Sequence, residues 1–238
     1  MARRPLGPTA AIVKRFYKQA IATEEGAIHL DGRAVKTPGR QDLAVPTAAL
    51  AAAIAAEWNG QGERIDPRSM PLTGLSNAAI DRIAADRSGF ADGLARYGES
   101  DLLCYRAEAP APLVARQAAA WDPILAWARR RYDVDFAVTA GIVHAPQPAN
   151  TIAQLAQAVH ARDAFALAGL SPLVTVSGSL VIALALAEGA IDFDTAWTAA
   201  TLDEQWQAEQ WGEDPEAAKA MAARRADFAA GHRFLGLL

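Results

Sequence analysis

The most informative stretch in the second half of the chain is Leu202-Asp203-Glu204-Gln205-Trp206-Gln207-Ala208-Glu209-Gln210-Trp211-Gly212-Glu213-Asp214. It holds two of the six tryptophans, five carboxylates and no basic residue. A helix turns by roughly 100° per residue, which places Glu204 on the same face as Trp197 and Trp211. Asp203 then points toward solvent. The spacing predicts a helix that carries one carboxylate on an aromatic stripe.

Glu204 needs a partner in this position, because an ionised carboxylate on an apolar face is costly unless something pairs with it. The partner is an arginine of the same chain, a ligand or another protein. The sequence leaves these alternatives open, and an internal ion pair is as good an interpretation as a binding site.

Helical spacing dominates the rest of the second half. We expect a helix that breaks at Pro123, a helix that starts with a Thr151–Gln154 capping box, and one buried helix over 173–187. Asp192 or Asp194 begins the helix that contains Glu204, and Gly212 ends it.

The first half contains the signature of a β-hairpin. Ala27–Leu30 and Arg33–Lys36 flank Asp31-Gly32, a pair suited to a two-residue turn. Short strands are expected before it and at 43–45, and Thr47 begins an Ala-rich helix. The run 101–105 is predicted as a strand. The fold class is therefore α+β, with an antiparallel β-rich domain with helices at 1–108 and a mainly α-helical domain at 109–238.

Charge is distributed unevenly along the chain. Residues 1–40 hold eight Lys or Arg against three acids, whereas residues 163–218 hold ten acids and no Lys or Arg. An acidic second half argues against a nucleic-acid binder and fits either docking within the chain or a basic protein partner. The leader contains Arg3 and Arg4, as transit peptides do, but has no apolar run of a secretory signal. We expect a bacterial cytoplasmic protein, with the mitochondrial matrix as the alternative, and no membrane insertion.

Enzyme signatures are missing from the sequence. It has no phosphate-binding glycine motif, and Ser177-Gly178-Ser179 lacks the frame of a nucleophile elbow. The one cysteine, Cys104, excludes a disulfide framework, and the four histidines show no metal-ligand spacing. We therefore expect no cofactor, no metal and no catalytic residue. The alternative is a hydrolase that uses the carboxylates of Asp203 and Glu204.

A set of short motifs runs in order along nearly the whole chain. They are Arg15-Phe16-Tyr17-Lys18, Leu30-Asp31-Gly32-Arg33, Val35-Lys36-Thr37-Pro38, Ala55-Ala56-Glu57-Trp58, Met70-Pro71-Leu72-Thr73, Ala79-Ile80-Asp81-Arg82, Asp101-Leu102-Leu103-Cys104-Tyr105-Arg106, Gln117 with Trp121-Asp122-Pro123, Ser177-Gly178-Ser179-Leu180, Asp203-Glu204 with Trp206-Gln207, and Trp211-Gly212-Glu213-Asp214. This ordered set resembles the family of assembly chaperones for the alpha subunit of the F-type ATP synthase catalytic head, called assembly factor 2 in mitochondria.

The resemblance implies a non-enzymatic chaperone with a β-rich N-terminal and a helical C-terminal domain. Such a protein binds the unassembled alpha subunit, prevents its aggregation and releases it as the alpha–beta ring forms. We expect the partner-binding residues to be Glu204, Trp206, Trp211, Asp203 and Trp197. Trp58 and Trp121 are expected to pack the joint between the domains. A scaffold subunit that stays in its complex is a further alternative.

Overall fold

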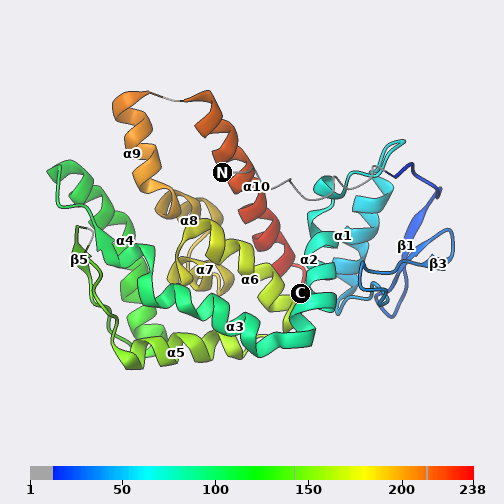
Figure 1. Cartoon of the computed structure of the whole chain (residues 1–238), viewed down its shortest axis with the longest axis horizontal. Helices are drawn as coiled ribbons and strands as arrows, with labels where there is room; N and C mark the ends of the chain where they lie inside the picture. The colour runs from blue at the N-terminus through cyan, green and yellow to red at the C-terminus, as the bar shows by residue number, and fades with distance from the viewer. Residues whose placement is uncertain (1–12, 142, 213) are drawn as a thin grey trace, which may run out of the picture. The chain divides into compact units, whose positions relative to one another are not determined.

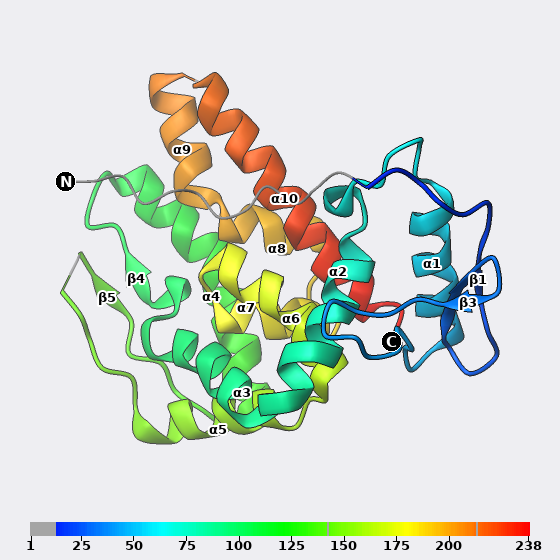
Figure 2. The ribbon, with the colours of Figure 1, turned by 45° about the vertical axis from the view of Figure 1, so that its right-hand side comes forward.

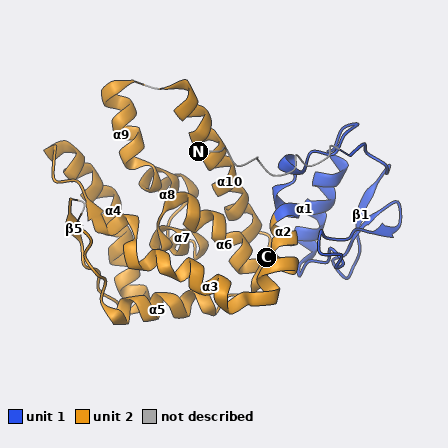
Figure 3. Cartoon of the chain, in the orientation of Figure 1, with its two compact units in different colours: residues 1–74 blue, residues 75–238 orange. Residues whose placement is uncertain are grey.

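The protein has two compact units, which the computed structural model places at Met1–Gly74 and Leu75–Leu238 (Figure 3). The structure describes residues 13–141, 143–212 and 214–238, so the leader and Glu213 lie outside the described residues. Along the sequence, the boundary between the units lies between Gly74 and Leu75, whereas the sequence predicts it between residues 108 and 109. Residues 87–95 form a helix that packs on two helices of the second half, and this packing joins them to the helical unit.

The elements are best followed in Figure 1. The strands are β1 (Ala20–Ala22), β2 (Ile28–Leu30), β3 (Arg33–Ala34), β4 (Tyr105–Arg106) and β5 (Thr139–Ala140). The α-helices are α1 (Ala48–Asn59), α2 (Pro71–Ala78), α3 (Arg87–Ala95), α4 (Ala111–Tyr132), α5 (Ala149–His160), α6 (Ala164–Ser177), α7 (Leu180–Ala187), α8 (Phe193–Ala200), α9 (Leu202–Trp211) and α10 (Pro215–Leu235). A π-helical turn, Ala79–Ile83, continues α2.

Unit 1 is built on the predicted hairpin. The sheet has the antiparallel order β1-β2-β3, with Ala20 opposite Leu30 and Leu30 opposite Arg33. Asp31 and Gly32 both have positive φ, at 48° and 82°, as a two-residue hairpin turn requires. Thr47 begins α1 by accepting a hydrogen bond from the Leu50 backbone amide at 3.1 Å. Helix α1 packs on the sheet, so the predicted α+β class is confirmed.

Two short strands predicted in unit 1 are only partly formed. Of residues 14–21, only the last two belong to a regular strand, and Lys14 forms an isolated bridge with Arg64. The stretch 43–45 contributes one bridge, between Ala27 and Ala44.

Unit 2 is a helical assembly around the buried helices α6 and α7. Helix α10 lies against α6, and glycines permit the close approach. A Cβ at Gly231 would lie 2.7 Å from the carbonyl oxygen of Gly169, so a side chain there would push the helices apart. None of the described helices is long and apolar enough to cross a membrane.

The predicted helix over 173–187 is wrong, because α6 ends and α7 begins inside it. Gly178 ends α6 with φ 67°, and Ser179 begins α7 by accepting a hydrogen bond from the Ile182 amide at 3.0 Å. The fully buried Asp101 accepts hydrogen bonds from the Ser179 hydroxyl at 2.7 Å and the Val181 amide at 3.0 Å. A helix start inside the protein needs such acceptors, because water cannot reach its free N–H groups.

Three further local predictions are wrong. Pro123 lies inside the continuous helix α4, and Ala119, whose carbonyl loses its partner, is exposed to water. Thr151 does not begin α5; its hydroxyl donates to the Asp135 carbonyl, and Pro148 precedes the helix. The run 101–105 is a 3-10 turn (Leu102–Cys104) that leads into β4, which pairs in parallel with β5.

The helix predicted from Asp192 to Gly212 is two helices. Asp192 begins α8 and Gly212 ends α9, as expected. Between them Thr201, with φ −117° and ψ 16°, interrupts the helical conformation. Because Thr201 leaves the helical conformation, the helical phase predicted from Trp197 to Glu204 does not hold across it.

The buried Asp101 carboxylate gives a test of this packing. We expect Asp101→Asn to lower the free energy of unfolding at neutral pH by about 1–3 kcal/mol, because its NH₂ group would face the N–H donors that the carboxylate accepts. Urea unfolding of both proteins measures the difference.

The comparison of wild type with Asp101→Asn also predicts a pH dependence of stability. Burial raises the pKa of Asp101 from 3.8 to about 6. A raised folded-state pKa means that this carboxyl contributes most to stability below pH 3.8 and loses the contribution as the pH rises through about 6. The stability difference between wild type and Asp101→Asn should therefore be larger at about pH 4 than at about pH 7. A difference that grows with pH would contradict this account.

Candidate functional site

Helix α9 has little apolar surface to bury. Leu202 is its one fully buried residue, and the others are half-buried or exposed. Packing of an apolar face, which holds most helices in place, is therefore weak here. Polar contacts to α4 and α10 fix its position instead.

Toward α4, two neighbouring residues bind α9. Arg116 forms a two-pronged ion pair with Glu209, at 2.7 and 2.9 Å, which lowers the pKa of that carboxyl. Gln117 donates from Nε2 to Asp203 Oδ1 at 2.8 Å and accepts from the Ala107 amide at 2.8 Å. Gln117 is buried, so each end of its amide depends on these partners.

Toward α10, Glu204 pairs with Arg224 at 2.9 Å. Arg224 also donates to the Val176 carbonyl near the end of α6, at 3.0 Å. Of the alternatives that the sequence left open for Glu204, the structure shows the arginine of its own chain.

The tryptophans occupy three different environments. Trp197 lies on α8, is 8% exposed and packs its ring on Phe228 at 5.7 Å. Trp206 is half-buried, and Trp211 is 80% exposed. Trp197 does not continue the predicted stripe, because the helix breaks at Thr201. Glu204 and Trp211 both lie on α9 and line a common groove, as their spacing predicts.

A hollow of about 390 Å³ opens on the α4 side of α9. Trp206 and Trp211 line it from α9, with Tyr105 and Pro110 from the segment before α4. Asp203 also lines it and, contrary to the prediction, is half-buried and bonded to Gln117 rather than free in solvent.

The carboxylate in this hollow is Asp203, and no described cation forms an ion pair with it. Arg106 lines the same hollow but binds Asp122 at 2.7 Å and the Leu103 carbonyl at 2.9 Å. In the described parts of the chain, Asp203 has no ion pair, whereas Glu204 and Glu209 each have an arginine. The hollow thus combines indole walls with a carboxylate that is available to a positively charged group.

A second, more apolar groove of about 660 Å³ lies between α9 and α10. Both views show these helices side by side (Figures 1 and 2). Its walls include Ala208, Ala217, Ala218 and Met221, and Glu204 faces it. Trp211 lines this groove and the hollow near Asp203, so it lies on the ridge between them.

This arrangement does not provide the paired carboxylates of a hydrolase. Asp203 and Glu204 are adjacent in sequence but line different hollows, and Glu204 is already paired. Within residues 13–141, 143–212 and 214–238, no three His, Cys, Asp or Glu side chains form a group that could hold a metal.

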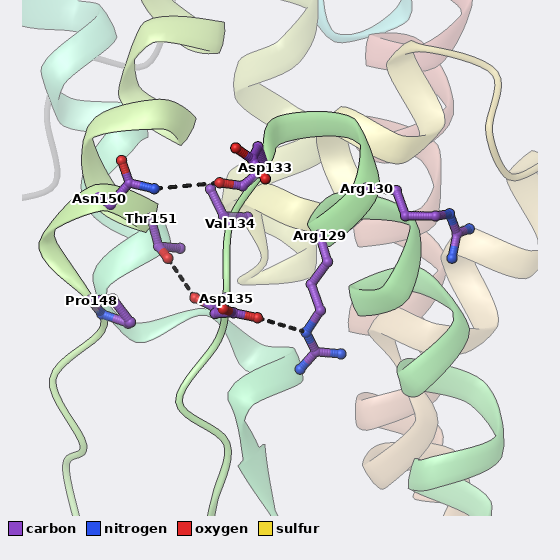
Figure 4. Close-up of a pocket in the computed structure, with 8 residues that line it drawn as sticks. All are labelled: Arg129, Arg130, Asp133, Val134, Asp135, Pro148, Asn150 and Thr151. Atoms are coloured by element: carbon purple, nitrogen blue, oxygen red, sulfur yellow. Dashed lines mark hydrogen bonds and ion pairs between the residues drawn. The ribbon is translucent and has the colours of Figure 1, made fainter.

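A polar hollow lies at the end of α4, and several of the residues that line it bind one another (Figure 4). The Thr151 hydroxyl bonds the Asp135 carbonyl, and Arg129 lies 3.9 Å from the Asp135 carboxylate. Arg130 points away from the other side chains in this view. We therefore favour the surface of α9 as the functional site.

The two tryptophans predicted at a domain joint lie in separate units. Trp58 packs in unit 1 on the ring of Tyr17, at 5.7 Å. Trp121 is buried in unit 2, and its indole N–H donates to the Ala199 carbonyl at 2.9 Å. Their role at a joint stays a prediction.

Sequence analysis missed the residues that hold α9. Arg116, Gln117 and Arg224 lie far from their partners in sequence, so no local spacing marks them. Gln117 belongs to one of the family motifs, but the sequence does not predict its contact with Asp203.

Gln117 offers a test of how α9 is held. We expect Gln117→Leu to lower the free energy of unfolding by about 1–3 kcal/mol, because the Ala107 amide and Asp203 both lose a buried partner. Gln207 lines the same hollow, is exposed and makes no hydrogen bond among the described contacts, so Gln207→Leu is the matched control. Equal urea midpoints for the two variants would show that Gln117 does not hold α9.

Comparisons with known proteins place this fold in a family. A family model described as ATP12 chaperone protein matches residues 14–129. The crystal structure of Atp12 from Paracoccus denitrificans matches with a TM-score of 0.89 and 42% identity, over 94% of this chain and 97% of that one. The Atu1473 protein of Agrobacterium tumefaciens matches with a TM-score of 0.89 and 42% identity, over 94% and 85%. Mitochondrial atp12 of Schizosaccharomyces pombe is 25% identical over 214 aligned positions, and the match covers 84% of this chain and 74% of that protein. The chain therefore belongs to the ATP12 chaperone family.

Proposed function

We propose that this protein binds the unassembled alpha subunit of the F-type ATP synthase catalytic head, prevents its aggregation and promotes assembly of the alpha–beta ring. Membership of the ATP12 chaperone family supports the general role, and the ordered motifs support the choice of client. The proposed role needs no chemical step. The relatives come from two bacteria and one mitochondrion; we propose the bacterial cytoplasm for this chain, with the mitochondrial matrix as the alternative.

The observation that carries the proposal is the exposed Trp211 on the ridge between two hollows of α9. A large aromatic side chain that is 80% exposed has not buried the apolar area that it offers. Tryptophan is enriched among the residues that dominate protein interfaces. Trp206, half-buried beside it, extends the same surface.

We further propose that Asp203 receives a lysine or arginine side chain of the client. Glu204, for which the sequence also predicts partner binding, is already paired with Arg224. Asp203 is oriented by the buried Gln117, the neutral partner that the described part of the chain gives it. A charged hydrogen bond formed there on binding contributes about 1.5–3 kcal/mol, which is about 10- to 100-fold in affinity.

The test compares two substitutions that remove the same charge from the same helix. We expect Asp203→Asn to weaken capture of a co-expressed alpha subunit by about 10-fold or more. An asparagine can still accept the Gln117 hydrogen bond, so the fold should stay intact. Glu204→Gln should weaken capture less, because Glu204 pairs within the chain. The readouts are the alpha subunit that co-purifies and the alpha subunit that remains in the soluble fraction.

Trp211→Ala is the second variant in this test. We expect it to leave thermal unfolding unchanged, since the side chain is largely in solvent, and to weaken capture by more than about 2 kcal/mol. If wild-type protein captured no alpha subunit, the proposed client would be wrong. If capture were normal in all three variants, α9 would not be the binding surface.

A further inference from the structure

A second exposed aromatic residue lies in unit 1, far along the chain from α9. Phe16 is 71% exposed, and its ring makes a T-shaped contact with the ring of the buried Tyr17, with the ring centroids 5.5 Å apart. It belongs to the motif Arg15-Phe16-Tyr17-Lys18, and neither the fold nor the surface of α9 gives a role to Phe16 itself. Single exposed apolar side chains are common on protein surfaces, and the charges around Phe16 are what distinguish it.

Phe16 lies on a face that also carries cations. In the extended segment 14–18, Arg15 and Tyr17 point inward, and Lys14, Phe16 and Lys18 are exposed. Arg64 is exposed and pairs with Lys14 across an antiparallel bridge, so their side chains share one face. We call Lys14, Phe16, Lys18 and Arg64 the Phe16 patch.

Among the residues that the structure describes, the cations of the Phe16 patch form no ion pair. The ion pairs described in unit 1 join Lys36 to Asp42 and Arg68 to Asp66, and neither pair includes a residue of the patch. Lys18 lies near enough to Asp31 to help lower the pKa of that carboxyl, but the main cause is the hydrogen bonds that Asp31 accepts from the Lys18 and Gln19 amides. The patch therefore presents a net positive face.

The patch is also held rigidly. The Arg15 guanidinium donates to the carbonyls of Tyr17, Lys18 and Asn59 at 3.1, 2.8 and 3.2 Å, and also to that of Gln61. It lies over the Tyr17 ring at 4.7 Å. The Tyr17 hydroxyl donates to the Trp58 carbonyl at 2.6 Å. A surface fixed in advance loses little conformational entropy on binding.

We infer that the Phe16 patch is a second docking surface, which takes an acidic segment of a protein partner that also offers an apolar contact to Phe16. Positive charge around the ring fits carboxylates around an apolar site, which is the usual arrangement of an aromatic anchor and a polar rim. An anionic membrane is the weaker alternative, because lipid-binding clusters carry about four to eight basic residues and stable anchoring takes a second signal. The inference rests on the proposed function in one respect: the partner tested is the alpha subunit.

Two variants test the patch. We expect Phe16→Ser to weaken capture of the alpha subunit by about 10-fold with unchanged thermal unfolding, since the ring is mostly in solvent. We expect Lys14→Glu/Lys18→Glu to weaken capture by about 10-fold at about 0.05 M salt and much less at about 1 M salt, where charges are screened beyond about 3 Å. The matched control is Arg33→Glu/Arg40→Glu, an equal charge change at exposed positions of the same unit.

The outcomes separate the two proposals. If wild type captures the alpha subunit and the patch variants capture it equally well, the patch inference is wrong and the proposed function stands. If wild type captures nothing, the proposed function fails, and the patch inference fails with it. If capture is unaffected but phosphatidylglycerol vesicles bind wild type and not Phe16→Ser, the patch is a membrane contact and the inference is wrong.

Discussion

A helix with almost no apolar surface to bury needs polar partners to keep its place. Helix α9 buries Leu202 and little else, so its position depends on the Arg116–Glu209 ion pair, the Gln117–Asp203 hydrogen bond and the Glu204–Arg224 ion pair. Exposed ion pairs are individually weak, at about 0–1 kcal/mol. Contacts on two sides, to α4 and to α10, together fix the direction of the helix. Both hollows beside Trp211 exist only because α9 stands in this position.

This arrangement gives the two faces of α9 different chemistry. On the α10 side the charge of Glu204 is neutralised and the groove is mainly apolar. On the α4 side Asp203 has no ion pair among the described residues, and it lines the hollow together with Trp206 and Trp211. Because the segment 163–218 contains no Lys or Arg, the cations that hold α9 come from elsewhere in the chain. A client that brings its own cation finds one carboxylate still available.

Local patterns were sufficient for some of the fold. Asp31-Gly32, Thr47 and Gly212 each determine a turn or a helix end through their own backbone preference or side chain, and each was predicted correctly. The break at Gly178 was not predicted, because Asp101, which stabilises the start of α7, lies 78 residues away in sequence. The break at Thr201 was not predicted either, and Trp121, which binds the Ala199 carbonyl just before it, also lies 78 residues away. Pro123 is tolerated inside α4 because Ala119, whose carbonyl loses its helical hydrogen bond, is exposed to water.

That Asp203, Glu204, Trp206 and Trp211 bind a partner stays a prediction, and the structure shows only where these residues lie. The sequence drew attention to Asp203, Glu204, Trp206 and Trp211 because acids and tryptophans gather there without a basic residue. It could not say which carboxylate is neutralised, because the partners of Glu209 and Asp203 are 93 and 86 residues away. Helical phase was right in placing Glu204 beside Trp211, and it was wrong for Trp197 because the phase was carried through the break at Thr201.

Hydrogen–deuterium exchange of the full chain, alone and with the alpha subunit bound, tests the central claim most directly. The account predicts that binding slows exchange of the backbone amides in α9 and in the first turns of α10, which form the walls of the apolar groove. Helix α5, which contributes no wall to either hollow of α9, should exchange at the same rate in both samples. Unchanged exchange in α9, with protection appearing in α5 instead, would contradict it.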